Sequence, residues 1–448
     1  MSLYPLSLLI HDLSKSPNYH SMNYQETIEY LYNQTPLFQK EGPGAYKEGL
    51  ENTFALDEHF GHPHTHYRTI HIAGTNGKGT CSHTLASILQ EAGYRVGLYT
   101  SPHLLDFRER IRVNGEMISE QRVIDFVEKE KEFFEPLYPS FFEVVTALAF
   151  KYFEEEKVDV AVIEVGLGGR LDCTNIIHPV LSLITNISFD HVALLGNTLG
   201  KIAAEKAGII KKACPVIIGE NHPETRPVFE AKAKEMGAPI TFAEDTSELL
   251  YHRSNRKGGI NYGTKSYGKI YSVLGGYCQS KNTNTILHAL PILQTVFHLT
   301  EKHIRDGFRN VITNTHLMGR WQMLGTSPSI VCDTGHNIGG FQYISKQLRA
   351  QHCKTLRIVL GMVNDKDING VLSLLPKNAT YYFTQASVKR ALPHDEIKRI
   401  AATHHLKGKS YERVELAVQS ALHDASPEDF IYVGGSTFVV ADLLKLYQ

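Results

Sequence analysis

A glycine-rich segment has the residue types and spacing most suited to chemistry. Gly74-Thr75-Asn76-Gly77-Lys78-Gly79-Thr80 lies between an apolar run at 69–73, typical of a strand, and an amphipathic stretch at 80–92, typical of a helix. Turn glycines let backbone amides approach an anion, the helix N-terminus adds positive potential, and Lys78 adds a full charge. We predict a phosphate-binding loop, although its spacing differs from G-x-x-x-x-G-K-[ST]. A glycine turn with a surface lysine is the alternative.

Alternating strand and helix patterns position this loop. Apolar runs predict strands at 95–100, 158–164, 180–187 and 215–218, and a helical pattern covers 141–156. This order predicts an α/β fold with a mostly parallel sheet and helices on both of its faces. We expect the Gly-, Tyr- and Lys-rich stretch at 241–276 to be β-rich structure within the same domain.

A second alternating pattern occupies the end of the 448-residue chain. Strand patterns at 329–333, 356–360, 380–384 and 430–433 alternate with helical stretches, and a polar segment near Thr313 separates them from the first set. This length favours more than one domain. We predict three parts: an N-terminal extension at 1–22, a central domain at 23–312, and a smaller Rossmann-like α/β domain at 313–448.

Composition excludes several classes of function. The 46 basic and 47 acidic residues give a net charge of −1, which argues against a nucleic-acid-binding protein. No apolar run is long enough to predict a membrane span, and the N-terminus has no signal-peptide pattern. The six cysteines form no C-x-x-C pair and are typical of reduced thiols. We expect a cytoplasmic protein with no nucleic-acid or membrane partner.

Motifs in a fixed order resemble those of the folylpolyglutamate synthase and dihydrofolate synthase family, within the Mur ligase superfamily. The resemblance is carried by GTNGKGT at 74–80, SPHL at 101–104, ERI at 109–111, NG at 114–115, EVGLGGRLD at 164–172, TNI at 185–187, DH at 190–191, EKAGII at 205–210, GR at 319–320 and DTGHN at 333–337. It therefore covers most of the chain. It implies a Mur-ligase-like fold with a P-loop-type central domain and a Rossmann-like C-terminal domain.

The resemblance implies a magnesium site made by Ser101, Glu164 and His191. Glu164 ends a predicted buried strand, and ligands bind at that edge of open α/β sheets. A carboxylate there suits Mg²⁺, which prefers oxygen ligands, whereas a solvent-facing strand end is the alternative reading. By residue pattern alone, Lys206 is a solvated helix residue. The resemblance implies that it is carbamylated and helps to hold a second Mg²⁺.

The resemblance also assigns residues to ATP. Loop residues Asn76 to Thr80 would bind the phosphates, and Asn282, which ends GYCQSKN at 276–282, would contact adenine. Arg320 would reach the phosphates and Asp333 the ribose, with His336 following in the same motif. Arginine suits this role because its planar fork bridges phosphate oxygens. From residue type alone, Arg320 and Asp333 are ordinary surface residues.

A folate site is implied by the segment Ser140-Phe141-Phe142-Glu143 and by Asp172. Ser140, Phe142, Glu143 and Asp172 match family positions that help to bind the pterin, and the Phe142 ring could stack on a planar heterocycle. A core phenylalanine on a helix is the alternative. The segment at 38–50 would be a mobile loop over the folate.

Histidines at 59, 62, 64, 66 and 71 precede the phosphate loop. Their spacing fits no familiar zinc pattern, and no cysteine is near. We expect a solvated loop, with His71 in the following strand.

The implied reaction is ATP-dependent amide formation between L-glutamate and dihydropteroate or a reduced folate such as tetrahydrofolate, through an acyl phosphate. Lys78, Lys206 and His191 would serve catalysis, two Mg²⁺ ions would assist, and the protein would be a monomer. The sequence leaves open which pteridine is used. The alternatives are another Mur-type amide ligase, a P-loop NTPase that forms no amide, and a binding module without activity.

Overall fold

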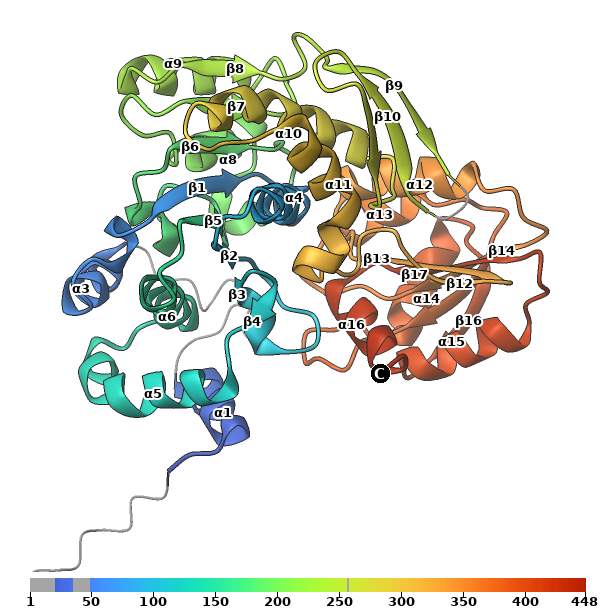
Figure 1. Cartoon of the computed structure of the whole chain (residues 1–448). Coiled ribbons are helices and arrows are strands. Elements are labelled where there is room, and N and C mark those ends of the chain that lie inside the picture. Colours follow the sequence, from blue (N-terminus) through green and yellow to red (C-terminus); the bar gives the residue numbers. More distant parts are fainter. Residues whose placement is uncertain (1–20, 35–48, 256–257) are drawn as a thin grey trace, which may run out of the picture.

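The computed structural model describes residues 21–34, 49–255 and 258–448. Figure 1 shows two bodies side by side: one built from the first two thirds of the chain, and one, coloured orange to red, built from the remainder. Most of the predicted extension at 1–22 and most of the predicted loop at 38–50 lie outside the described residues. Within the described residues, no helix is both long and apolar enough to cross a membrane.

An eight-stranded sheet is the centre of the first body, with the order β4-β3-β2-β5-β1-β6-β7-β8. The six strands from β2 to β8 in that order are parallel, and the short β3 and β4 extend one edge antiparallel. Their bounds are β1 Arg68–Ala73, β2 Val96–Tyr99, β3 Ile111–Val113, β4 Glu116–Met117, β5 Val160–Glu164, β6 Leu181–Ile184, β7 Val216–Ile218 and β8 Ile240–Phe242.

Helices cover both faces of this sheet, as the alternating pattern predicts. One apolar core joins the sheet to α4, α10 and α11, and another joins its opposite face to α1, α3, α5 and α6. The helices are α1 Tyr24–Gln34, α3 Glu51–His59, α4 Lys78–Glu91, α5 Glu120–Phe134, α6 Phe141–Glu155, α7 Val192–Leu195, α8 Leu199–Ala207, α9 Arg226–Met236, α10 Gln279–Gln294 and α11 Glu301–Thr315. Short 3-10 turns are η2 Pro63–Thr65, η3 Phe107–Arg110, η4 Glu135–Leu137 and η5 Cys173–Ile176.

The β-rich prediction for 241–276 is confirmed. Besides β8, this stretch forms an antiparallel sheet of β9 Leu249–Ser254, β10 Ile260–Thr264 and β11 Lys269–Ser272, with β10 in the middle. The buried side chains Ile260, Tyr262 and Ile270 join the same core as α4 and α10. The small sheet is therefore part of the first body.

The second body is a six-stranded sheet with the order β12-β13-β17-β14-β15-β16, parallel except for the edge strand β12. The strands are β12 Gln322–Thr326, β13 Ser329–Asp333, β14 Leu356–Leu360, β15 Thr380–Thr384, β16 Gly408–Tyr411 and β17 Phe430–Gly434. Its helices are α12 Ile338–Arg349, α13 Ile368–Leu374, α14 His394–Thr403, α15 Val414–His423 and α16 Thr437–Lys445. All four predicted strands are present. The edge strands β12 and β16 were not predicted from the sequence. Neither has a fully buried side chain, so neither has the apolar run that is typical of a buried strand.

The predicted boundary at Thr313 falls in the last turn of α11. That helix packs closely on α4, where Asn314 Nδ2 donates to Ser87 Oγ at 3.0 Å and Nδ1 of His83 lies 2.9 Å from Thr315 Oγ1. The helix ends where His316 takes a left-handed conformation, with φ 55°. The chain therefore crosses to the second body just after α11.

Candidate functional site

The glycine-rich segment joins the end of β1 to the start of α4, as predicted. Gly77 precedes α4 with φ 85°, a left-handed conformation that favours glycine, and Lys78 is the first helical residue. Lys78 Nζ donates to the carbonyls of Gly74 and Thr75 at 3.2 Å each. The lysine therefore folds over the loop at a helix N-terminus, where its charge and the loop amides can meet an anion.

The loop is fastened to the chain that follows β6, which contains the T-N-I motif. Asn186 accepts from the Asn76 amide and donates Nδ2 to the Asn76 carbonyl, both at 3.1 Å, while Thr185 Oγ1 donates to the same carbonyl at 2.6 Å. Thr75 Oγ1 donates to the Ser188 carbonyl at 3.1 Å. These bonds hold the loop backbone in one conformation before any ligand arrives.

Asn282, which was predicted to contact adenine, lies against this loop. A Cβ placed on Gly77 would lie 2.2 Å from Asn282 Oδ1, so the Asn282 side chain on α10 reaches the loop closely. Asn282 Nδ2 donates to Gln279 Oε1 at 2.8 Å, and Gln279 Nε2 approaches Thr80 Oγ1 at 3.5 Å. Predicted residue Asn282 thus lies directly against Gly77, and Gln279 lies between it and Thr80.

Arg320 approaches the same loop from the second body. A Cβ on Gly79 would lie 3.4 Å from Arg320 Nη2, and Glu164 carboxylate oxygens would lie slightly farther away. Arg320 also bonds to Thr334 Oγ1. Both sheets therefore contribute charged groups around the first turn of α4.

Asp333 lies at the end of β13, as predicted, but its carboxylate is engaged by the backbone. It accepts from the amides of Trp321 and Gly335, both at 2.8 Å. Burial raises the pKa of Asp333, while the charge of Arg320 opposes this. In this arrangement the carboxylate shapes the turn that carries Arg320.

The predicted metal ligands occupy adjoining hollows between the two bodies. Ser101 and His191 line the main cleft, and Glu164 and Ser101 line a smaller hollow beside it. Glu164 Oε2 accepts from the Ser101 amide at 3.2 Å, and burial raises the pKa of Glu164 against the opposing charge of Lys78. Burial lowers the pKa of His191 to about 3, so its ring is neutral and able to ligate a metal near pH 7.

Within 21–34, 49–255 and 258–448, no group of three or more acidic, histidine or cysteine side chains forms a metal site by itself. The donor set that is present has one carboxylate, one hydroxyl and one neutral imidazole. Mg²⁺ commonly binds one or two protein carboxylates and takes its other ligands from substrate phosphates and water. Ser101, Glu164 and His191 therefore fit a magnesium ion that binds together with a nucleotide.

Lys206 is buried, so the expectation from residue pattern of a solvated helix residue is wrong. Its side chain on α8 points into the cleft, where Nζ donates to the Gly74 carbonyl at 3.0 Å. Burial and the charge of Lys78 lower its pKa to about 7. A substantial fraction of this amine is therefore uncharged near neutral pH, which is the form that acts as a nucleophile.

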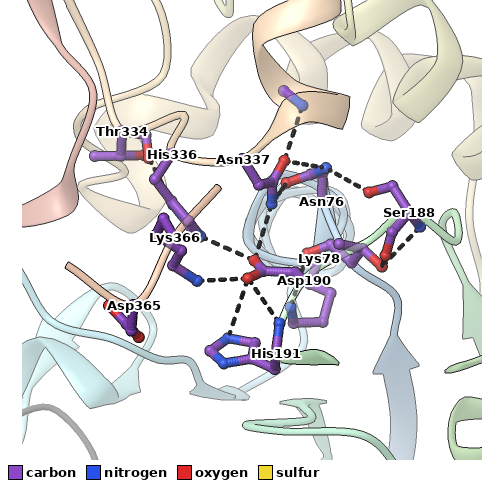
Figure 2. A network of polar contacts seen from close by, with 12 residues as sticks. Asn76, Lys78, Ser188, Asp190, His191, Thr334, His336, Asn337, Asp365 and Lys366 are labelled. Carbon is purple, nitrogen blue, oxygen red and sulfur yellow. Dashed lines mark hydrogen bonds and ion pairs between the residues drawn. The ribbon is translucent and has the colours of Figure 1, made fainter. Parts of the chain in front are cut away.

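Asp190, which lines the main cleft, joins the two bodies through polar contacts (Figure 2). Asn337 Nδ2 donates to Oδ2 at 2.9 Å, His336 Nε2 lies 3.2 Å from the same oxygen, and Lys366 Nζ contacts Oδ1 at 2.5 Å. Burial opposes ionisation of Asp190, but His336, His191 and Lys366 hold its pKa well below its usual range. A buried ionised carboxylate thus links the bodies beside predicted residues His191 and His336.

The predicted folate residues also line the main cleft. We call their part of the cleft the apolar side; it is lined by Phe141, Phe142, Val165, Leu167 and Leu171. The Phe142 ring packs directly on the backbone at residue 166, where a Cβ would lie 2.4 Å from it. The ring is half-buried and faces the cleft, which agrees with a stacking surface more than with a fully buried core position.

The acidic residues of the apolar side are used for internal caps. Glu143 forms a capping box with Ser140 at the start of α6, in which Glu143 Oε2 accepts from the Ser140 amide at 2.6 Å. Asp172 accepts from the amides of Leu167 at 2.8 Å and Thr174 at 3.0 Å. Ser140, Glu143 and Asp172 all line the cleft, but these carboxylates hold its walls in place.

The histidines at 59, 62 and 64 have specific side-chain partners, whereas the sequence predicts a solvated loop. Asp57 lies 2.6 Å from Nδ1 of His62 and 2.8 Å from Nδ1 of His64, and His59 stacks on Phe133 with ring centroids 3.6 Å apart. Asp57 therefore holds the exposed His62 ring and the largely buried His64 ring in place, and aromatic stacking holds His59.

Several cleft residues were not singled out from the sequence. Lys366 and Arg390, with Ser436 to Phe438 at the start of α16, form the wall contributed by the second body. Lys366 follows β14 in the polar segment at 363–367. Its position after the carboxyl end of a predicted strand was an available signal.

Two family models match the chain: the Mur ligase middle domain over residues 72–273, and the Mur ligase glutamate ligase domain over residues 319–437. The chain is 30% identical over 438 residues to dihydrofolate synthase/folylpolyglutamate synthase of Bacillus subtilis, covering 94% of this chain and 98% of that protein. It is 34% identical to the Escherichia coli protein of the same name, covering 84% and 85%. It spans half the length of a probable bifunctional folylpolyglutamate synthase/dihydropteroate synthase of Haloferax volcanii, at 32% identity.

Solved structures show the same architecture. E. coli FolC in complex with DHPP and ADP superposes with a TM-score of 0.81 at 30% identity, covering 95% of this chain and 98% of that one. A Yersinia pestis folylpolyglutamate synthase/dihydrofolate synthase complexed with AMPPNP and Mn ion gives 0.77 at 29% identity, covering 95% and 98%. With two Mur ligase domains in order and near full-length similarity to these enzymes, the chain belongs to the folylpolyglutamate synthase/dihydrofolate synthase family.

Proposed function

We propose that this protein is an ATP-dependent ligase that adds L-glutamate to dihydropteroate, to a reduced folate, or to both. The observation that carries the proposal is one cleft whose walls have two kinds of chemistry. A phosphate-type loop with Lys78 and the apolar side with Phe142 both line it. A solved relative with DHPP and ADP bound supports this pairing of ligands.

The proposed reaction has two steps. An oxygen of the pteridine substrate's carboxylate attacks the γ-phosphorus of ATP, the bond to ADP breaks, and an acyl phosphate forms. The amino group of L-glutamate then attacks the acyl carbon, loses a proton and expels phosphate. Lys78, the loop amides and Arg320 would stabilise negative charge on the transferred group.

Divalent metal would be bound together with the nucleotide by Ser101, Glu164 and His191. When bound, Mg²⁺ supplies positive charge that neutralises the phosphate oxygens. The solved relative with AMPPNP and Mn ion supports the use of a divalent metal. Chelation with EDTA should abolish turnover, and added Mg²⁺ should restore it.

Lys206 would be carbamylated and would help to hold a second Mg²⁺. The neutral amine attacks CO₂, a C–N bond forms, and one proton is lost, so the neutral amine becomes an anionic carbamate. The lowered pKa of Lys206, about 7, supports this chemistry. A crystal structure grown with bicarbonate should show a carboxylate group beyond Nζ. Clear density for an unmodified amine pointing away from the metals would refute it.

The remaining predicted roles follow the geometry of the loop and the apolar side. Asn282 would contact adenine, Asp333 would support the ribose end of the nucleotide, and His336 would belong to the same ATP site. Phe142 would stack on the pteridine, with Ser140, Glu143 and Asp172 shaping its pocket. Closure of the two domains, 23–312 and 313–448, would complete the site. Because one chain supplies both walls, we propose a monomer, acting in the cytoplasm.

The test is a coupled assay of ADP release, with each pteridine supplied separately. ADP release should require ATP, L-glutamate and at least one of dihydropteroate or tetrahydrofolate. ADP release that does not depend on glutamate would favour a P-loop NTPase. No release with either pteridine would favour another Mur-type ligase, whose carboxylate substrate is missing from the assay.

A further inference from the structure

The T-N-I segment has a role in the structure that the proposed reaction does not use directly. Asn186 pairs with both the amide and the carbonyl of Asn76, so this one side chain sets the backbone at the middle of the phosphate loop. Because Oδ1 accepts and Nδ2 donates in this pairing, the orientation of the Asn186 amide is defined. Its second Nδ2 hydrogen is available for another acceptor.

Glu220 supplies that acceptor. It follows β7 at the carboxyl edge of the sheet, and its Oε1 accepts from Asn186 Nδ2 at 3.1 Å. The Glu220 amide donates to the Thr185 carbonyl at 2.9 Å, which holds the two segments side by side. Glu220 therefore orients the side chain that orients the loop.

The other oxygen of Glu220 is bound from the second body. Tyr343 on α12 donates its hydroxyl to Glu220 Oε2 at 3.2 Å. Both side chains are only half-exposed, so water competes less for this bond than on an open surface. One carboxylate thus connects the second body to the loop through a continuous set of hydrogen bonds.

The same helix also meets the loop directly. Asn337, the N-cap of α12, exchanges side-chain hydrogen bonds with Asn76 at 3.0 and 3.1 Å. Two residues later, a Cβ on Gly339 would lie 2.6 Å from Ser188 Oγ. Helix α12 therefore contacts the loop and its T-N-I support at its first turn, and contacts Glu220 one and a half turns later.

We propose that Glu220 is a positioning residue for nucleotide binding, acting through Asn186 on the phosphate loop, and that Tyr343 couples this positioning to the placement of the second body. The inference rests on the proposed function for the identity of the nucleotide. With α12 docked, Glu220 is held by Tyr343 and presents a fixed acceptor to Asn186. When α12 moves away, Glu220 loses one of its two partners and the loop loses part of its support.

Glu220 is tested with a pair of substitutions and two readouts. Glu220→Leu removes both acceptors, whereas Glu220→Gln keeps an oxygen for Asn186. We expect Glu220→Leu to weaken ADP binding, measured by calorimetry, and to raise KM for ATP, each about tenfold, with a smaller change in kcat. Glu220→Gln should stay within about twofold of wild type in both. Glu235→Leu, at an exposed glutamate on α9, is the matched control.

Tyr343 tests the coupling. Tyr343→Phe should weaken ADP binding about threefold alone and add nothing in the Glu220→Leu background, because the two residues act as one unit. Tyr411→Phe, which removes a hydroxyl bonded to Ser420 within the second body, should match wild type. If Glu220→Leu unfolds below the assay temperature, Glu220→Ala carries the same expectations, since water can fill its half-exposed site.

The inference is overturned if folded Glu220→Leu binds ADP as tightly as wild type, if Glu220→Gln is as impaired as Glu220→Leu, or if Tyr343→Phe adds its full effect to Glu220→Leu. Calorimetry with ADP needs no ligase turnover. A wild-type protein that binds ADP but shows no glutamate-dependent turnover would therefore refute the proposed function, while the binding pattern of the variants would still decide this inference.

Discussion

The loop side of the cleft, residues 74–80, and the apolar side use charge in opposite ways. On the loop side, Lys78 and Arg320 surround the start of α4, where loop amides can meet an anion. On the apolar side, the carboxylates of Glu143 and Asp172 accept hydrogen bonds from their own backbone. A charged residue in a family motif can thus either meet a ligand or build the wall that the ligand meets.

The largest effect should come from the loop side. Lys78→Ala removes the ammonium group that lies over the loop. We expect glutamate-dependent ADP release to fall at least about 100-fold. Protein stability should change little, because the hydrogen bonds that Lys78 makes to the described residues go to two loop carbonyls. Lys302→Ala, at an exposed lysine on α11, is the control. Near-normal turnover in Lys78→Ala would mean that the charge of Lys78 in the loop is not needed for the reaction.

Asp172→Ala should show the opposite pattern. It leaves the amides of Leu167 and Thr174 without their acceptor, so we expect the free energy of unfolding to fall by about 2 kcal/mol. Urea denaturation of the variant and wild type measures this difference. Unchanged stability together with a large rise in the pteridine KM would mean that Asp172 meets the ligand directly. The difference between the loop side and the apolar side in their use of charge would then be wrong.

Phe142→Ala tests the surface that these caps support. Loss of a stacking ring should raise KM for the pteridine about tenfold while KM for ATP stays near wild type. Steady-state kinetics with each substrate varied in turn separates the two. Phe133→Ala, at the ring that stacks on His59 away from the cleft, should alter neither KM. Equal changes in both KM values for Phe142→Ala would argue for a general packing defect.

The smallest effect concerns one buried histidine under each side. His71 contacts Thr174 beneath the apolar side, and His83 on α4 contacts Thr315 beneath the loop side. Burial lowers both pKa values from 6.5 to about 3, so the unfolded chain takes up these protons first as pH falls. Stability from each is complete above pH 6.5 and is lost as pH falls toward 3.

We expect each histidine to cost about 1 kcal/mol of unfolding free energy between pH 6.5 and pH 5.5. Urea unfolding of wild type, His71→Gln and His83→Gln at both pH values measures this. Each variant should lose about 1 kcal/mol less than wild type over that interval. A pH dependence identical to wild type would mean that the histidine is not buried in its neutral form.

The sequence predicts the loop side well because its parts are adjacent in the chain. Strand, glycines, Lys78 and helix follow one another, so pattern alone places them. Both sheets and most of their strands were predictable for the same reason. The sequence does not predict the caps on the apolar side. The identity of an Asp or Glu does not tell whether its carboxylate meets a ligand or a backbone amide.

The sequence also does not predict burial that arises from contacts between residues far apart in the chain. Lys206 reads as a solvated helix residue, yet packing of α8 beneath the loop buries it. Two bonded pairs, Asp190 with Lys366 and Glu220 with Tyr343, form only after the two sheets fold and dock. Their members are 176 and 123 residues apart in the sequence. No local pattern carries that information.

The most direct test of the central claim is the product itself. Wild-type protein with Mg²⁺, ATP and ¹⁵N-labelled L-glutamate is incubated with dihydropteroate and, separately, with tetrahydrofolate, and the products are analysed by mass spectrometry. We predict that at least one pteridine gains labelled glutamate through an amide, with one ADP formed per glutamate added. ADP formation with no labelled amide product would contradict it.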